Sequence, residues 1–291
     1  MKPVTAKERV RCRPIGPADL GAVATLLCEG FAGRSRASIE TGLERLTARD
    51  VPEGLQRYGY CLDTGSRLVG VILLIASERQ TDGGTAFFCN VASWYVLQDF
   101  RAYAQLLVSM ALKNKQLTYT NVSPAPHTWE IVERQGYTRY CNGLFLAAAI
   151  LKRPAPGVVI ESFGAPDHEG MADFAMLLRH QQMGCEVVVA RSGNAVKGYV
   201  FRRYRIRAGR LPLPAMFAIH APDRDELVRI AGNLGRHFMG KAAPFLVMDA
   251  DGPVEGLRGI YTERRGRKYF KGPCRPALSD LADTEYAVFG V

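Results

Sequence analysis

The sequence predicts a two-domain α/β protein (α+β in stricter usage), with helices flanking a sheet in each half. The chain has 291 residues, enough for about two domains. Strand and helix patterns alternate through residues 10–151, and a similar order starts again after residue 157. Between them, Lys152–Gly157 holds two prolines and a glycine, which interrupt regular structure. We therefore expect a domain at 1–151, a linker at 152–157 and a second domain at 158–291.

The first half follows from its apolar spacing and turn residues. The segment 20–31 repeats apolar residues at helical spacing, and 36–48 does so with Ile39, Leu43 and Leu46. Thr64–Ser66 is a hairpin turn, and Tyr103, Leu106, Leu107, Met110 and Ala111 mark one helix face within 98–113. The patterns predict helices at 20–31, 36–48, 98–113 and 126–135, and strands at 10–15, 58–63, 68–77, 86–97 and 117–122, with one or two final strands within 137–151.

The second half repeats this alternation. A helix is expected with Met171, Phe174, Ala175 and Leu178 on one face, and another over Asp223–Phe238, where five apolar residues are in phase. The predicted strands are 158–163, 185–190, 196–205, 215–220 and 245–249, with a last hairpin from 261–270 and 284–291.

A local match between the halves suggests an internal duplication. Residues 65–70 (GSRLVG) and 193–198 (GNAVKG) have two glycines at the same spacing, in each case at a turn entering a strand. The alternative is two unrelated α+β domains that share common turns.

Composition narrows the functional classes. The net charge of +10 is spread as +4 over residues 1–150 and +6 over the remainder, which favours anionic partners. Seven dispersed cysteines without a CxxC pair indicate free thiols rather than disulfides or zinc. The longest apolar runs fall far below the ~20 residues of a membrane span, and the polar N-terminus has no signal-peptide pattern. We expect a cytoplasmic protein.

At the junction Trp94–Leu107 an apolar strand runs into a helix. This junction is the first of two motifs in the first half that resemble the GNAT superfamily of acyl-CoA-dependent N-acyltransferases. The family has Arg/Gln-x-x-Gly-x-Gly/Ala here, and a helix N-terminus is suited to a pyrophosphate. Arg101 matches the first position, whereas Ala102 and Ala104 stand where glycine is frequent, and Leu106 replaces the last small residue.

The second motif is Tyr119–Val122 followed by Trp129–Tyr137. It resembles the family's strand ending near Asn, here Asn121, and its short helix running into Gly136-Tyr137. Many members carry a tyrosine four residues before that glycine, which protonates the leaving CoA thiolate. Val132 stands there in this chain and has no proton to give.

The resemblance implies two GNAT-like domains, each a mixed, mostly antiparallel sheet flanked by helices, with the second degenerate. At its corresponding junction Asp223, Asp225 and Glu226 would repel a pyrophosphate. We therefore expect at most one CoA site, with acetyl-CoA or another acyl-CoA as co-substrate. The implied cofactor-binding residues are Tyr95, Val96, Leu97, Arg101, Ala102, Tyr103, Ala104, Gln105, Leu106 and Asn121.

The catalytic groups stay open at this point. His127 and Tyr95 are the candidates for proton transfer, each against a plainer interpretation as a solvent-facing or half-buried residue. Glu78, Tyr137 and Cys89 are weaker alternatives. The histidine spacing predicts no metal site.

We expect transfer of an acyl group to an amine of a small molecule or peptide, with an anionic acceptor as one option. The alternative is a non-catalytic tandem domain that binds CoA, a metabolite or a protein. The basic stretches 202–207 and 264–271 interleave aromatics with charge, yet on strands they favour a solvated face over a nucleic-acid site. The sequence leaves the oligomeric state open.

Overall fold

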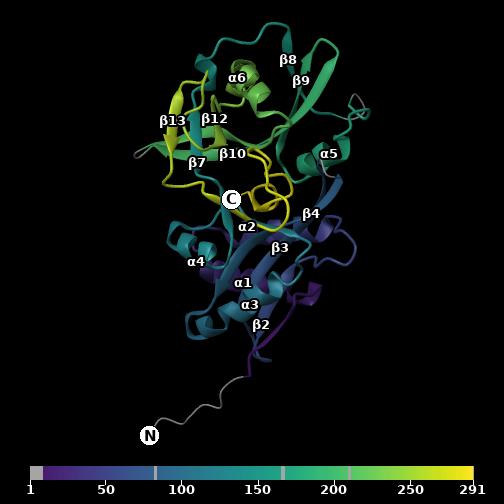
Figure 1. Cartoon of the computed structure of the whole chain (residues 1–291), viewed down its shortest axis with the longest axis vertical. Coiled ribbons are helices and arrows are strands. Elements are labelled where there is room, and N and C mark those ends of the chain that lie inside the picture. The colour runs from purple at the N-terminus through teal and green to yellow at the C-terminus, as the bar shows by residue number, and fades with distance from the viewer. Residues whose placement is uncertain (1–8, 82–83, 165–167, 209–210, 291) are drawn as a thin grey trace. The chain divides into compact units, whose positions relative to one another are not determined.

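The computed structural model describes residues 9–81, 84–164, 168–208 and 211–290. Its contacts divide the chain into two compact units. Unit 1 comprises residues 1–121 and 271–274, and unit 2 comprises residues 122–270 and 275–291. Within the described residues no helix is long and apolar enough to cross a membrane. The elements of both units are labelled in Figure 1.

Within the described residues, five strands lie wholly in unit 1, with helices beside them. The strands are β1 (Arg11–Pro14), β2 (Gly59–Asp63), β3 (Leu68–Thr81), β4 (Gly84–Val96) and β5 (Thr118–Asn121). The α-helices are α1 (Leu20–Gly30), α2 (Arg36–Ala48) and α3 (Ala104–Ala111), and the 3₁₀ turns are η1 (Pro17–Asp19) and η2 (Gln98–Tyr103). Buried residues at helical spacing, such as Val23 and Leu27 of α1 and Ile39 and Leu43 of α2, form the core side of these helices.

Unit 2 contains the remaining elements, with α6 over the centre of its sheet. The strands are β6 (Thr138–Cys141), β7 (Gly143–Ala147), β8 (Val158–Ser162), β9 (Glu186–Ser192), β10 (Ala195–Ala208), β11 (Leu211–His220), β12 (Phe245–Ala250), β13 (Gly259–Thr262) and β14 (Lys268–Lys271, whose last residue is in unit 1). The helices are η3 (Pro126–Thr128), α4 (Trp129–Arg134), η4 (Ala149–Leu151), α5 (Phe174–Gln182), α6 (Arg224–Met239) and α7 (Glu285–Val288). One face of α6 packs its apolar residues into the core, among them Leu227, Ile230 and Leu234.

The described strands form two seven-stranded sheets with the same plan. The orders are β1-β2-β3-β4-β5-β14-β6 and, in the matching direction, β8-β9-β10-β11-β12-β7-β13. In each sheet one pair is parallel, β4 with β5 and β11 with β12, and the other resolved registers are antiparallel. The expected mixed, mostly antiparallel sheets flanked by helices are confirmed. The hairpins β2–β3 and β9–β10, which carry the two matched glycine turns, take the same places in the two orders.

The two sheets exchange one strand. The place next to β5 in the first sheet is taken by β14 from the end of the sequence, and the equivalent place beside β12 is taken by β7 from the first half. The contact-based division of the chain accordingly falls at 121/122, thirty residues before the expected boundary at 151, and adds 271–274 to unit 1. Local periodicity identifies β7 as a strand but does not say which sheet it joins.

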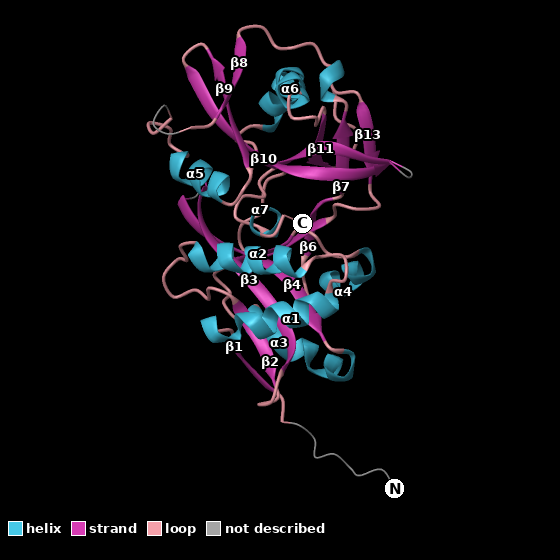
Figure 2. Cartoon of the chain, turned by 180° about the vertical axis from the view of Figure 1, so that it is seen from behind, coloured by secondary structure: helices cyan, strands magenta, loops and turns pink. Residues whose placement is uncertain are grey.

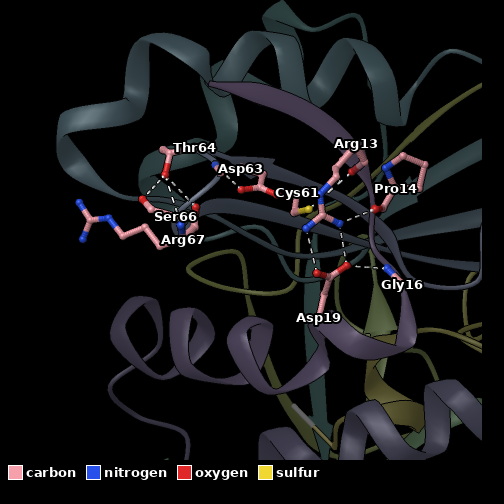
Figure 3. Close-up of polar contacts among 10 residues, drawn as sticks. Arg13, Pro14, Gly16, Asp19, Cys61, Asp63, Thr64, Ser66 and Arg67 are labelled. Atoms are coloured by element: carbon pink, nitrogen blue, oxygen red, sulfur yellow. Dashed lines mark hydrogen bonds and ion pairs between the residues drawn. The ribbon is translucent and has the colours of Figure 1, made fainter. Parts of the chain in front are cut away.

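An ion-pair network ties the start of α1 to the first two strands (Figure 3). Arg13 on β1 donates to both carboxylate oxygens of Asp19 at 2.7 and 2.9 Å, and its Nε donates to Asp63 on β2 at 2.8 Å. The Gly16 amide also donates to Asp19, at 2.8 Å. These donors lower the pKa of Asp19 to about 2, chiefly through Arg13.

Two secondary-structure predictions and the predicted apolar face of α5 were wrong. Residues 98–113 begin as the 3₁₀ turn η2, and the α-helix spans only Ala104–Ala111. Residues 285–288 form the helix α7 instead of a strand, and a short buried run such as this cannot be assigned by periodicity alone. In α5 the buried residues are Leu177 and His180, so the predicted face was out of phase, and Met171 precedes the helix.

Candidate functional site

In unit 1, β4 and β5 pair over a short stretch only. Their parallel register covers Phe88, Cys89 and Asn90 of β4, whereas β4 continues to Val96 and β5 ends at Asn121. At the end of the pairing the side-chain amide of Asn90 donates through Nδ2 to the Thr120 carbonyl at 3.1 Å. Beyond it, no described strand pairs with the β5-side edge of β4 over residues 91–96. Backbone groups on such an edge can hydrogen-bond an extended ligand.

A β-bulge lies in this part of β4. Leu73 of β3 pairs with Ala92 and Val71 pairs with Tyr95, so two residues of β4 face one residue of β3. Ser93 in the bulge has a φ of 47°, which is uncommon for a residue other than glycine. The Arg34 guanidinium donates to the Ser93 hydroxyl at 3.3 Å. A bulge re-aims the strand and its side chains, and such features are frequent next to active sites.

The side chain of Tyr95 packs against the end of α1. A Cβ added to Gly30 would lie 2.4 Å from the Tyr95 ring, so only glycine permits this approach. The rings of Phe31 and Tyr95 are 6.3 Å apart at a tilt of 57°, and the Arg34 guanidinium lies 5.0 Å from the Phe31 centroid. We call Phe31, Arg34, Ser93 and Tyr95 the Tyr95 cluster. It places a phenol, a hydroxyl and a cation beside the unpaired part of β4.

The segment after β4 is open to solvent. Arg101, Ala102, Tyr103, Gln105 and Leu106 are exposed. The expected apolar face was wrong at Tyr103 and Leu106, because the buried residues of α3 are Leu107, Val108 and Ala111. A 3₁₀ turn has about 3.0 residues per turn instead of 3.6, which rotates the following side chains out of the predicted phase. The cationic Arg101 and two exposed apolar side chains therefore flank an accessible backbone.

The expected site residues divide between the units. Tyr95, Val96, Leu97 and residues 101–106 are contiguous in unit 1, and Asn121 ends the neighbouring strand β5. His127 is an exposed residue of η3 and belongs to unit 2, as does Val132, which is 1% exposed in α4. Tyr137 is buried in the same unit.

The weaker catalytic candidates Cys89 and Glu78 differ in their exposure to solvent. Cys89 is buried, and burial raises the pKa of its thiol to about 12, which keeps it protonated and a poor nucleophile at neutral pH. Glu78 is an exposed residue of β3. Within the described residues no group of three or more His, Cys, Asp or Glu side chains could hold a metal ion.

Unit 2 has the counterpart of this open strand edge, but the chain itself fills it. β11 is parallel to β12 over Ala215, Met216 and Phe217, and has a register shift farther along. Beyond the parallel pairing, the Leu281 amide donates to the Ile219 carbonyl at 2.7 Å and the Ala221 amide donates to the Ser279 carbonyl at 3.1 Å. The segment 279–281 therefore fills the edge of β11 that corresponds to the open edge of β4. No local sequence pattern predicts this pairing of residues 279–281 with β11.

The helix after β11 is also closed to an anion. The Asp223 carboxylate accepts from the amides of Asp225 and Glu226 at 2.9 and 3.1 Å, and these bonds lower its pKa. The first N–H groups of α6 are thus already satisfied by a negative charge, which leaves this helix N-terminus unsuited to a pyrophosphate.

Solved structures share this architecture, although the sequences have diverged far. No protein-family model matches the chain, and no curated protein matches it by sequence. The GCN5-related N-acetyltransferase from Anabaena variabilis superimposes with a TM-score of 0.60 at 10% identity, over 90% of this chain and 72% of that one. The enzyme of the same description from Kribbella flavida gives 0.57 at 14% identity, over 90% and 70%. Eis1 from Mycobacterium abscessus gives 0.52 at 10% identity, over 94% and 74%. The chain has the fold of the GCN5-related N-acetyltransferases.

Proposed function

We propose that unit 1 transfers an acyl group from acyl-CoA, with acetyl-CoA as the first candidate, to an amine acceptor. The observation that carries the proposal is the open edge of β4 between Asn90 and Val96, with its bulge at Ser93. The exposed segment 98–106 follows directly and carries Arg101. The GNAT resemblance of the sequence and the fold shared with solved acetyltransferases support the same reaction.

The chain's own groups suit such a donor. The backbone of residues 95–97 would bind the pantetheine arm, and residues 101–106 with Asn121 would lie along the pyrophosphate. Arg101 supplies a positive charge there, and Ala102 and Ala104 add only a methyl group each where the family often has glycine. Tyr103 and Leu106 offer apolar contact on an otherwise solvated surface.

The reaction needs two proton transfers. A C–N bond forms between the neutral amine and the thioester carbon, the C–S bond breaks, the nitrogen loses a proton and the thiolate gains one. Acyl-CoA supplies the activated thioester. Tyr95 is our first candidate for the acid because it belongs to the stretch of β4 beyond its pairing with β5, where contacts with Gly30 and Phe31 hold its ring. His127, the other candidate from the sequence, is an exposed residue of unit 2 and has no part in this proposal for unit 1.

A non-catalytic role is the second candidate function. The specific observation in its favour is Val132, a buried apolar residue at the position where many relatives carry the acid. Under that alternative the open edge of β4 binds CoA, a metabolite or a protein segment without acyl transfer.

The first experiment measures release of CoA thiol from acetyl-CoA over a panel of primary amines, with mass spectrometry of the products. We expect release with at least one acceptor class. Acetyl-CoA that binds but is consumed with no amine would favour the binding module, and absence of binding at millimolar acetyl-CoA would overturn both the cofactor and the activity.

Two matched variants locate the chemistry. Tyr95→Phe removes one hydroxyl and should lower kcat about a hundredfold, with the KM for acetyl-CoA little changed. Tyr261→Phe, which removes a tyrosine hydroxyl in unit 2, should retain wild-type kcat. Equal rates for both variants would remove Tyr95 from the mechanism and leave the proposed activity standing.

A further inference from the structure

Unit 2 contains a cavity of about 570 Å³ that the proposed acyl transfer does not use. It lies on the sheet face opposite α6, because Leu144 and Leu146 of β7 alternate with Phe145, which belongs to the core beneath that helix. Figure 2 labels β7, β11 and β13 in this part of the unit. The cavity is lined by Leu144, Leu146, Tyr204, Arg205, Ile206, Val247, Thr262, Arg264 and Arg265.

The lining of the cavity has an apolar part and a polar, cationic part. Its floor is apolar and comes from β7, β12 and β10, with Val247 only 2% exposed. Tyr204 adds an aromatic ring, held at 5.6 Å from the ring of Phe217. Three arginines and Thr262 supply the polar part. A site of about 300–1,000 Å³ with an apolar body and a few convergent polar groups is typical of small-molecule binding.

The three arginines give the cavity a strong positive charge. Arg205, Arg264 and Arg265 are exposed, and no acidic side chain in the described residues forms an ion pair with any of them. Glu263 is the acidic neighbour in sequence, but it accepts a hydrogen bond from the Tyr261 hydroxyl at 3.1 Å and does not line the cavity. No acidic residue is part of the lining.

We propose that this cavity binds a small amphipathic anion, a molecule with an apolar body and a phosphate or carboxylate end. The apolar floor would take the body, with a gain of about 25 cal/mol for each Å² of apolar surface removed from water. The arginines would take the anionic end, since a guanidinium matches phosphate and carboxylate oxygens with paired N–H groups.

The two basic stretches of the sequence thereby acquire a joint role. Arg205 comes from β10, while Arg264 and Arg265 follow β13, some sixty residues later, and the fold brings them to one concave site. A single-stranded nucleic acid is bound along an extended groove with successive stacking platforms. A cavity with one aromatic side chain and an aliphatic floor fits a small ligand better. The proposal concerns unit 2 alone and stands whether or not unit 1 transfers acyl groups.

The test is isothermal titration calorimetry of the full chain with octyl phosphate as the probe. Octanol carries the apolar body without the charge, and inorganic phosphate carries the charge without the body. The affinities of octyl phosphate and octanoate, compared with each other, show whether the site prefers phosphate or carboxylate. We expect octyl phosphate or octanoate to bind at least about tenfold more tightly than octanol and inorganic phosphate.

A charge-matched pair of double variants identifies the site. Arg264→Gln/Arg265→Gln removes two charges from the cavity and should weaken octyl phosphate at least about tenfold. Arg203→Gln/Arg275→Gln removes two exposed charges outside the lining and should leave affinity within about twofold. Circular dichroism checks that both variants are folded, and Arg101→Gln reports any binding of the probe in unit 1.

Four outcomes would overturn the proposal. They are absence of octyl phosphate and octanoate binding at millimolar concentration, equal binding of octanol, equal loss in the two double variants, and loss of binding in Arg101→Gln alone. Tighter binding of a single-stranded oligonucleotide, lost in the cavity variant, would assign the site to nucleic acid instead.

Discussion

Gly30 is the last residue of α1, and its closeness to the Tyr95 ring gives the sharpest test of the site geometry. The proposed change is Gly30→Ala. The added Cβ would lie 2.4, 2.5 and 2.8 Å from three ring carbons of Tyr95, including the one that joins the ring to its Cβ. Real Cβ atoms do not approach carbon this closely, so the ring or the end of the helix must move.

Two effects of opposite sign decide the magnitude. Alanine is favoured over glycine within a helix by about 0.5–1 kcal/mol. Overpacking a well-filled site costs about 1–3 kcal/mol. We expect Gly30→Ala to lower the free energy of unfolding by about 1 kcal/mol on balance. Gly21→Ala on the same helix is the matched control, because its Cβ meets nothing within 4 Å, and it should stabilise by about 0.5 kcal/mol.

Urea unfolding measures both changes, and a double-mutant cycle with Tyr95→Ala, which removes Cγ and the whole ring, assigns the cause. With the ring removed, Gly30→Ala should lose its penalty. Displacement of Tyr95 should also lower acyl-transfer kcat in Gly30→Ala and leave Gly21→Ala unchanged. Equal stabilisation by the two alanines would refute the contact between α1 and Tyr95, and with it the Tyr95 cluster.

Three further predictions rest on other charged groups. The Arg13 guanidinium lowers the pKa of Asp19 to about 2 in the folded protein, below the value of about 3.9 in the unfolded chain. The ion pair therefore stabilises the fold fully above about pH 3.9, and this stabilisation is lost as pH falls toward 2. Asp19→Asn should lower the free energy of unfolding by about 1 kcal/mol at neutral pH, after allowance for partial exposure. Urea titrations from pH 7 to 3 should show this difference from the wild type shrinking below about pH 4. A difference that stays constant with pH would contradict the ion pair. Lys268 and Asp249 form a fully buried ion pair at 2.7 Å. Lys268→Met leaves the Asp249 charge buried alone and should destabilise the fold by about 3–5 kcal/mol, and Lys268→Met/Asp249→Leu should recover most of this loss. A single variant as stable as the double variant would argue against the buried ion pair. Asp99→Asn removes an exposed negative charge from η2 and should tighten acetyl-CoA binding about twofold at low salt by calorimetry, and an unchanged affinity would place the phosphates elsewhere.

Local patterns predicted most of the elements. The helix at Arg36–Ala48 was predicted with its observed bounds from apolar residues at helical spacing. In the structure Ser35 caps it by accepting from the Ser38 amide at 3.2 Å. The strands β3 and β10 were predicted shorter than they are, since their ends at Thr81 and Ala208 are polar or small. Element type thus follows from sequence more closely than element ends do.

The long-range pairings could not be predicted in this way. β7 joins the second sheet and β14 the first, and neither strand differs in composition from one that would stay in its own half. The same holds for Ser279–Leu281, which fills the edge of β11 through backbone groups that every residue possesses. The family resemblance indicated a degenerate second site from Asp223, Asp225 and Glu226, whereas the structure adds a physical obstruction by Ser279–Leu281.

The residues of the candidate site stay a prediction. They were singled out from the resemblance of the Trp94–Leu107 junction to a family motif, and in the structure residues 101–106 are largely exposed although η2 replaces the first helical turns. The bulge at Ser93 was missed, since a positive φ at a serine leaves no sequence signal comparable to glycine. Arg205 and Arg264 were interpreted as solvated faces of strands, and their convergence on one cavity depends on the fold.

The central claim is that the chain has one acyl-CoA site and that unit 1 contains it. Calorimetric titration of acetyl-CoA tests this most directly, through its stoichiometry. We predict one molecule bound per chain, with affinity reduced about three- to tenfold by Arg101→Gln and unchanged by Arg11→Gln, which removes an exposed charge from β1. A stoichiometry of two, binding that is insensitive to Arg101→Gln, or no binding at millimolar acetyl-CoA would contradict it.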